Sequence, residues 1–566
     1  FTPLVGRTTE LHLLLDRWQL ACDGEGQVVM ISGEPGIGKS CLLQGLCMHA
    51  AETEHLRMQL QCSPYHTNSP LYPAIQQIIR EAGIVSSDDG DAKLDKLEAL
   101  LESGNNGASA DIQIFSHLLS LPYQTRYGKL SLPAQQFKER LLNALVDRLC
   151  QLAAHRPVLF LFEDTHWIDP TSLEFLERAI GRLQDVHVLL VVAHRPGWQP
   201  PISGHSHVTS LQLSRLGRVR SADIVRGIAG ETLDENLVAQ ILERADGVPL
   251  FIEELTKSLV ESGFGGTAAV VPPTLQASLT ERLDRLGDAK EVAQIGAVIG
   301  REFSHALLAA VAGKSEADLQ VVINRLVQSE LLFRRGEPPE TSYSFKHSLV
   351  RDTAYGSLLF ASRRRWHRKV AETLEGDFVE VSEGEPEIVA HHWLEANEPA
   401  YATPLLLRAG RLASGRSASK EAVAHLEKCL ALHDLGVSNE LNKKRELQIL
   451  AAFGPALMTV KGFGNSEIGE ILRRAYAVCE QIGDEEHIFL IAWNLWLHYQ
   501  VGGDLERENQ QLEKVAYLAE STNSEEYQLE AHHAVWTSAF SRGDFRRAMR
   551  HCADGLTIYS PEKHHQ

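Results

Sequence analysis

The sequence predicts an α/β fold with a parallel sheet for the first part of the chain and an all-helical fold for the last part. The first prediction rests on four continuous apolar runs, which are typical of strands buried on both faces, and on the amphipathic stretches between them, which suit crossover helices. The runs are Val28 to Ile31, Leu56 to Gln61, Val158 to Phe162 and Val186 to Ala193. The second prediction rests on helical periodicity from about Tyr401 onward.

A glycine-rich loop follows the first apolar run. The stretch ISGEPGIGKS obeys Gly-x-x-x-x-Gly-Lys-Ser through Gly33, Gly38, Lys39 and Ser40. Such glycines let backbone N–H groups point at phosphate oxygens, and the following helix adds its positive end. A glycine-rich turn with an unrelated lysine is disfavoured because a strand precedes the loop and a helix follows it.

This loop predicts a site for ATP or ADP with Mg²⁺. Lys39 is expected to reach the β and γ phosphates, and Ser40 to bind Mg²⁺. The expected nucleotide-binding residues of the loop are Gly33, Glu34, Pro35, Gly36, Ile37, Gly38, Lys39, Ser40 and Cys41.

Two acidic residues, Glu163 and Asp164, come directly after the apolar run VLFLF. A phosphate loop needs a second acidic group to hold Mg²⁺. Neighbouring residues on a strand point to opposite faces, so one of the two is expected to face the metal and the other to polarise water or cap the next turn. Because the run is buried on both faces, its alternation does not decide which carboxylate binds the metal.

Arg195 follows the last of the four runs, at the edge of the sheet where nucleotides bind. It is expected either to sense the γ phosphate or to pair with a surface carboxylate. With Lys39, Glu163 and Asp164, it completes the set of candidate catalytic residues.

The middle of the chain changes character at a Pro- and Gly-rich segment, His194 to Gly204. This segment is predicted to close the sheet, with helices and no further strand up to Gly263. A linker is predicted at Gly263 to Thr274. Beyond it, helical patterns precede two short strand-like runs within Leu331 to His347, an order that predicts a winged-helix-like domain.

The helical part repeats a Gly-Asp dipeptide at Gly483-Asp484, Gly503-Asp504 and Gly543-Asp544. Glycine suits the left-handed end of one helix, and aspartate caps the start of the next. The spacing is close to one helix or one helix pair, which predicts a solenoid of tetratricopeptide-like helical repeats.

The net charge and the cysteines indicate which binding partners and which cellular compartment are expected. A formal net charge of −19 disfavours general binding to nucleic acids or anionic membranes. The basic segment Arg363 to Lys369 is interpreted as a helix surface paired with nearby glutamates. Eight scattered cysteines without a metal-binding spacing, and no long apolar run, predict a reduced cytoplasmic protein. Because the chain opens with Phe1, it is also expected to be part of a longer polypeptide.

Several motifs resemble those of the signal-transduction ATPases with numerous domains (STAND), relatives of the AAA+ ATPases. They are LVGRTTEL, GEPGIGKS, FEDTHWIDPTSLEFL, VAHRPG and ADGVPLFIEEL, in this order. More narrowly, AVIGREF, SFKHSLVRDTAYGSLL and RSASKEAVAHLEKCLAL resemble the ATPase modules attached to class III adenylate or guanylate cyclases in multidomain bacterial proteins.

The resemblance implies roles for three further groups of residues. Val5, Gly6 and Arg7 resemble the motif beside the adenine and ribose, and Pro249 resembles the lid proline that packs on the adenine. His347 resembles the winged-helix histidine that touches the β phosphate in the ADP state. Ser348 stands where that motif usually has aspartate.

The expected domains are a P-loop NTPase core (1–215), a helical lid (216–265), a winged-helix-like domain (270–362), a helical linker (363–400) and tetratricopeptide-like repeats (401–566). We expect an ATPase switch with slow turnover that receives a protein or ligand at the repeats and regulates an effector of the same polypeptide, such as an upstream cyclase. A nucleotide-dependent oligomer is a further expectation. A transcriptional regulator whose DNA-binding domain lies outside these residues, and a solenoid scaffold that does not hydrolyse ATP, remain alternatives.

Overall fold

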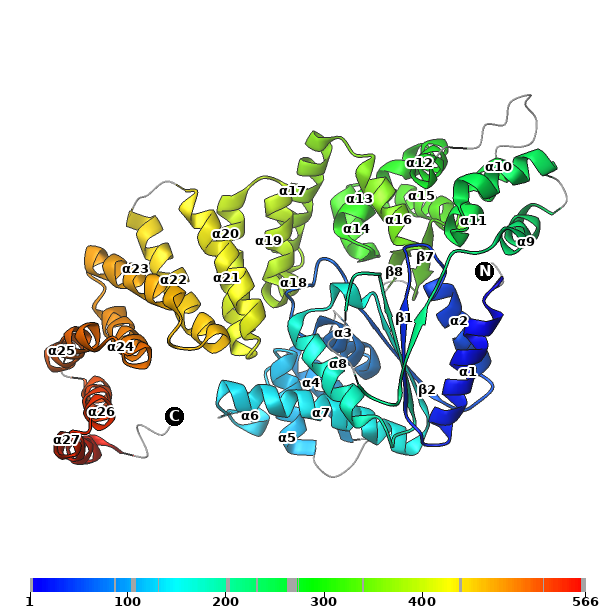
Figure 1. The fold of residues 1–566 in the computed structure, drawn as a ribbon. Helices are drawn as coiled ribbons and strands as arrows, with labels where there is room; N and C mark the ends of the chain where they lie inside the picture. The colour runs from blue at the N-terminus through cyan, green and yellow to red at the C-terminus, as the bar shows by residue number, and fades with distance from the viewer. Residues whose placement is uncertain are drawn as a thin grey trace. The chain divides into compact units, whose positions relative to one another are not determined.

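The computed structural model describes residues 4–85, 88–102, 108–130, 132–199, 204–230, 233–261, 272, 274–337, 341–436, 440–522 and 524–560. They form two compact units (Figure 1): Phe1–Gly128 with Glu139–Glu398, and Lys129–Lys138 with Pro399–Gln566. The predicted linker at 263–274 lies almost entirely outside the described residues. Within those residues, no helix combines the length and apolar character that a membrane crossing requires.

A parallel sheet of five strands, in the order β2-β3-β4-β1-β5, forms the centre of the first unit. The strands are β1 (Gln27–Ser32), β2 (Leu56–Gln61), β3 (Val158–Glu163), β4 (Val188–His194) and β5 (Val208–Gln212). All four predicted strands are confirmed. The prediction that each is buried on both faces was wrong for β2, which lies at an edge of the sheet and has only one fully buried residue, Leu60. The prediction that no strand follows residue 204 was wrong, because β5 adds an edge strand that pairs with β1.

Alternating side chains of β3 enter two cores. Leu159 and Leu161 pack in one apolar cluster with residues of α1 (Thr8–Cys22) and α2 (Lys39–Ala50), whereas Phe160 packs on Phe175 of α8 (Pro170–Arg182) on the opposite face. Figure 1 shows α1 and α2 covering one face of the sheet and α3 and α8 the other. The remaining helices of this region are α3 (Tyr72–Ala82), α4 (Gly90–Glu102), α5 (Ala108–Leu118), α6 (Gln124–Tyr127), α7 (Ala134–His155) and the 3-10 turn η1 (Thr165–Trp167).

Three helices follow the sheet and form a small helical lid with its own apolar cluster. They are α9 (Arg218–Ala229), α10 (Glu235–Ala245) and α11 (Pro249–Glu261). Buried Ile241 and Leu255 lie in this cluster, and Val5 from the start of the chain packs against it.

A winged-helix-like arrangement comes next. Its antiparallel sheet has the order β6-β8-β7, and β7 and β8 form the predicted hairpin. The elements are α12 (Leu275–Arg285), α13 (Asp288–Ile299), β6 (Glu302–Ser304), α14 (His305–Ala312), α15 (Glu316–Gln328), β7 (Leu332–Arg335), β8 (Ser342–Phe345) and α16 (Ser348–Gly356). The unit ends with α17 (Phe360–Gly376), α18 (Val379–Gly384) and α19 (Pro386–Glu395).

The second unit consists mainly of helices, each packed against its successor. They are α20 (Pro399–Gly415), α21 (Ser419–Asp434), α22 (Glu440–Lys461), α23 (Ser466–Ile482), α24 (Glu485–Gly502), α25 (Leu505–Thr522), α26 (Glu525–Ser541) and α27 (Phe545–Ile558).

The Gly-Asp joints of this unit have the predicted conformation. The three glycines are left-handed, and each aspartate carboxylate accepts a hydrogen bond from the backbone N–H three residues on. These caps satisfy N–H groups that the first turn of a helix leaves without partners. The predicted fold class, an α/β P-loop core with a parallel sheet, a helical lid, a winged-helix-like domain and a C-terminal all-α tetratricopeptide-like solenoid, is confirmed.

Candidate functional site

The phosphate loop joins β1 to α2 and leaves open space beside Gly38. A Cβ on Gly33 would lie 2.7 Å from Cγ2 of buried Ile37, so the loop closes tightly there. Gly38 has a φ of 101°, which favours glycine, and no atom lies within 4 Å of where its Cβ would be. That open space, at the start of a helix, fits a phosphate group.

Lys39 and Ser40 begin α2. The Nζ of Lys39 donates to the carbonyl oxygens of Gly33 at 2.6 Å and Glu34 at 3.1 Å. Burial lowers the pKa of Lys39 to about 8, an effect that the Asp164 carboxylate partly opposes and Arg195 reinforces. The Lys39 amine therefore lies at the loop, where a bound anion would stabilise its charged form.

Glu163 lies beside Ser40. The Ser40 hydroxyl donates to Oε2 of Glu163 at 3.2 Å, and Nε2 of Gln59 donates to Oε1 at 2.7 Å. Burial, together with the neighbouring charge of Asp164, raises the pKa of the Glu163 carboxyl. Hydroxyl and carboxylate oxygens are ligands that Mg²⁺ accepts, so this pair fits the metal that the loop implies.

Asp164 contacts a different set of groups. Its carboxylate forms an ion pair with Arg301, which directly precedes β6, and the amide of Gln61 lies beside both. Asp164 also has a left-handed backbone with a φ of 56°, which is uncommon for a residue with a Cβ. The two carboxylates, adjacent in sequence, thus contact two different parts of the molecule.

Arg195 follows β4 and is half-buried. Among the described residues its guanidinium has no ion-pair partner, in contrast to the expected alternative of a surface carboxylate. His166, in η1, lies close enough to feel the charges of Arg195, Asp164 and Lys39. Both of its ring nitrogens are buried without a hydrogen-bond partner in the described structure, and burial lowers its pKa to about 4.

The start of the chain and the lid both reach the loop. Arg7 is 4% exposed and donates through Nη2 to the carbonyl oxygens of Ile37 at 3.2 Å and Ser214 at 2.5 Å. The backbone N–H of Leu250, one residue after the predicted adenine-packing Pro249, donates to the Gly36 carbonyl at 3.2 Å. The first turn of α11 is thereby attached to the phosphate loop.

His347 follows β8 and precedes α16. Its Nε2 is buried and has no hydrogen-bond partner within the described ranges. Burial lowers its pKa to about 4, and the positive charge of Lys346 contributes. A neutral imidazole with one unused ring nitrogen can accept or donate one hydrogen bond, as a phosphate contact would need.

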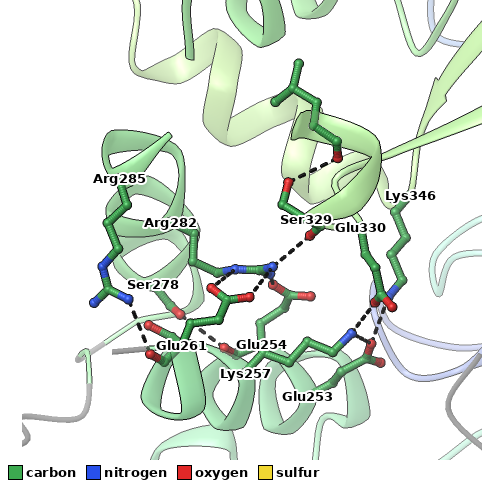
Figure 2. A network of polar contacts seen from close by, with 12 residues as sticks. Glu253, Glu254, Lys257, Glu261, Ser278, Arg282, Arg285, Ser329, Glu330 and Lys346 are labelled. Carbon is green, nitrogen blue, oxygen red and sulfur yellow. Dashed lines mark hydrogen bonds and ion pairs between the residues drawn. The ribbon is translucent and has the colours of Figure 1, made fainter. Parts of the chain in front are cut away.

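An ion-pair network connects the lid to the winged-helix-like domain (Figure 2). Glu253 of α11 accepts from Lys346 and from Lys257, each at 2.9 Å, and Lys346 also contacts Glu330 at 3.0 Å. Although burial alone would raise the pKa of Glu253, these hydrogen bonds lower it to about 2.

The same figure shows Arg282 of α12 linking three elements. Its guanidinium pairs with buried Glu254 of α11 and with Glu261 at 3.0 Å, and it donates to the Ser329 carbonyl at 2.9 Å.

The structure brings Lys39, Ser40 and Glu163 together, with Asp164 next to them. It puts Arg7 under the loop. Four further residues at the site were not predicted from the sequence: Gln59, Gln61, His166 and Arg301. The two glutamines could have been predicted. They lie two residues apart, on one face of β2 at its carboxyl end, and Gln61 pairs with Glu163 of the neighbouring strand β3. Arg301 could not have been predicted, because its partner lies 137 residues away.

Residues 3–192 match the family model of the AAA ATPase domain. This segment is an AAA-type P-loop NTPase domain. ATP and Mg²⁺ are the usual ligands of such a domain; the open space beside Gly38 fits a phosphate group, and the Ser40–Glu163 pair fits the metal.

Nearly the whole chain, from the AAA ATPase domain to the helical repeats, is also similar to a curated relative, an uncharacterized protein of Rhizobium meliloti. The two are 28% identical over 589 residues, which cover 99% of this chain and 55% of the relative. The chain thus spans about half the length of that relative.

Two solved structures are similar at low identity. A STAND protein with a tetratricopeptide repeat sensor from Pyrococcus horikoshii is 13% identical, with a TM-score of 0.38, over 99% of this chain and 83% of that one. Drosophila ORC bound to DNA is 12% identical, with a TM-score of 0.28, over 63% of this chain and 88% of that one.

Proposed function

We propose that the chain is an ATP-operated signalling switch that binds ATP with Mg²⁺, hydrolyses it slowly and couples the bound nucleotide to docking of the winged-helix-like domain. One observation carries this proposal: two later parts of the chain, the lid and the winged-helix-like domain, both contact the phosphate site. The lid reaches the loop through Leu250, and the winged-helix-like domain reaches Asp164 through Arg301. An enzyme acting on a small substrate would not need the winged-helix-like domain on its acidic residue.

Each group of residues at the site has its own part in this proposal. Backbone N–H groups of residues 33–41 and the Lys39 amine hold the phosphates. Ser40 and Glu163 hold Mg²⁺, which when bound neutralises charge on the terminal phosphates. Asp164, whose carboxylate does not contact Ser40, orients the attacking water. Arg195 and His166 are available for the γ phosphate.

The energy needed for such a switch is within reach of these contacts. Moving a two-state equilibrium from mostly off to mostly on takes about 5.5 kcal/mol of differential binding. Hydrogen bonds to charged groups contribute about 1.5–3 kcal/mol each, so two to four contacts made in only one state suffice. Lys39, Arg195 and the magnesium ligands Ser40 and Glu163 are the contacts we assign to this difference.

The input and output of the switch belong to the same proposal. We assign the input, a protein or small ligand, to the helical repeats of α20 to α27. The output acts on an effector elsewhere in the polypeptide, and the motif resemblance favours a nucleotide cyclase. Oligomerisation in the ATP state would be a further output.

Nucleotide content of the purified protein tests the site. Lys39→Ala is expected to remove bound nucleotide, which is measured by denaturing the protein and separating the released nucleotides. Lys314→Ala is the control, because Lys314 pairs with Glu291 on the winged-helix-like domain. If Lys39→Ala still retains nucleotide at the wild-type level, the site assignment is wrong.

A second pair of variants separates the two acids. Glu163→Gln is expected to weaken ATP binding in the presence of Mg²⁺, whereas Asp164→Asn is expected to keep ATP bound and unhydrolysed for hours. Wild-type protein that also fails to convert bound ATP to ADP would favour the non-hydrolysing scaffold.

A further inference from the structure

We propose that Arg301 is a built-in inhibitor of the ATPase site, which holds Asp164 in an ion pair for as long as the winged-helix-like domain is docked. The inference rests on the proposed function and names its regulation. Asp164 is the acid that the Ser40–Glu163 pair leaves available for the attacking water, and Arg301 comes from another part of the chain.

The small antiparallel sheet positions Arg301. Arg301 directly precedes β6, and its carbonyl oxygen accepts from the backbone N–H of Phe345 at 3.0 Å, at the end of β8. His347 lies two residues beyond Phe345. Arg301 and His347 therefore lie at the same end of two paired strands, β6 and β8, and move together if the winged-helix-like domain moves.

The pair itself is half-buried rather than superficial. The side chains of Arg301 and Asp164 are 30% and 26% exposed, and Nη1 of Arg301 contacts Oδ2 of Asp164 directly. The Gln61 amide lies against both groups. Ion pairs at this depth are screened less by salt than exposed ones.

Pairing with a guanidinium changes what Asp164 can do. One of its carboxylate oxygens is occupied by the guanidinium, so fewer acceptor positions remain for a hydrogen bond from the attacking water. Undocking the winged-helix-like domain removes Arg301 and restores the carboxylate. By reciprocity, any ligand that engages Asp164 weakens docking to the same extent.

A second attachment makes the effect cooperative. Lys346, adjacent to His347, pairs with Glu253 of the lid helix α11 (Figure 2). The winged-helix-like domain thus binds an acid of the sheet through Arg301 and an acid of the lid through Lys346. Losing the first contact is expected to loosen the domain without releasing it completely.

Arg301→Met is the central test, since it removes the charge and keeps most of the side-chain volume. The release rate of a fluorescent ADP analogue is expected to rise about 5- to 30-fold, the range for loss of one partly exposed charged hydrogen bond. Hydrogen exchange should increase in peptides covering 158–169 and 301–305. Single-turnover ATP hydrolysis should accelerate.

Two further variants provide the controls. Arg335→Met removes an exposed arginine of the same small sheet, whose Nη1 lies 3.9 Å from Oε1 of Glu302. It should change neither release of the ADP analogue nor hydrogen exchange. Arg301→Lys keeps a charge but loses the planar fork, and should give an intermediate release rate. If Arg301→Met does not fold, as judged by circular dichroism, Arg301→Lys decides the question.

A double-mutant cycle isolates the pair. Asp164→Asn should also speed release of the ADP analogue. The double variant with Arg301→Met should release it no faster than the faster single variant. Additive effects would overturn the proposal, as would unchanged release in Arg301→Met. Slower hydrolysis with weaker nucleotide binding in Arg301→Met would also overturn it, because Arg301 would then assist the nucleotide. These failures differ from failure of the proposed function, which Lys39→Ala tests separately.

Discussion

Raising the pH above 8 is expected to weaken nucleotide binding, because it discharges Lys39. The amine is half-buried against the loop, where it donates to the carbonyl oxygens of Gly33 and Glu34. Burial lowers its pKa to about 8 from the ordinary value of 10.5. The group is charged below that pH and neutral above it, and only the charged amine attracts phosphate oxygens strongly.

The size of the effect follows from the charged fraction. With a pKa of about 8, roughly nine-tenths of the Lys39 amines carry a proton at pH 7 and roughly one-tenth at pH 9. If only the charged form binds well, the apparent Kd for ADP rises about tenfold across this range. With the ordinary lysine pKa, the amine would stay almost fully charged and the Kd would hardly change.

The assay is a titration with a fluorescent ADP analogue at fixed Mg²⁺, from pH 7 to pH 9.5. Lys39→Arg is the matched control, since a guanidinium keeps its charge throughout this range. Its affinity differs from that of the wild type, but its pH profile should be flat. Calorimetry in two buffers of different ionisation enthalpy should show proton uptake by the wild type above pH 8. A wild-type profile as flat as that of Lys39→Arg would refute the reasoning.

Two predictions concern the second unit. Gly410→Ala should destabilise the packing of α20 on α21 by about 1–3 kcal/mol, because the new Cβ would lie 2.5 Å from Cγ of Leu426. Gly415→Ala is the control and should be nearly neutral, because its new Cβ would have no atom within 4 Å. Thermal unfolding, together with hydrogen exchange in α20 and α21, compares the two variants. Equal effects of the two substitutions would contradict the packing argument. Asp544→Ala should lower the free energy of unfolding by about 1 kcal/mol and increase hydrogen exchange in α27, because the carboxylate caps the N–H of Arg547. Asp544→Asn should retain the cap. An equal loss of stability in the Asn and Ala variants would contradict the prediction.

The edge of the sheet shows where sequence patterns lose their information. The strands β1, β3 and β4 are buried on both faces, so their apolar runs are continuous and easily recognised. The strand β5 lies at the edge, and its residues, VTSLQ, are partly or fully exposed. Its hydrogen bonds to β1 come from a partner about 180 residues earlier, so its sequence alone resembles a loop.

The phosphate loop illustrates the opposite case. Its function depends on backbone conformation, which Gly33 and Gly38 permit locally, and on a lysine and a serine at fixed positions beside them. For Arg7, the structure adds the position of the side chain. The motif resemblance implied a role near the nucleotide, and the structure shows the side chain buried beneath the loop, on the Ile37 carbonyl.

The sequence by itself determined the nucleotide loop, the presence of two acids after a buried strand, and the helical repeats with their Gly-Asp joints, because each depends on residues close together in the chain. Only the tertiary structure decided what each acid contacts. Glu163 shares a strand face with Leu159 and Leu161, and it lies beside Ser40 because that face packs on α2. Asp164 meets Arg301 because the winged-helix-like domain docks there, and no local pattern encodes a contact formed by packing between distant segments.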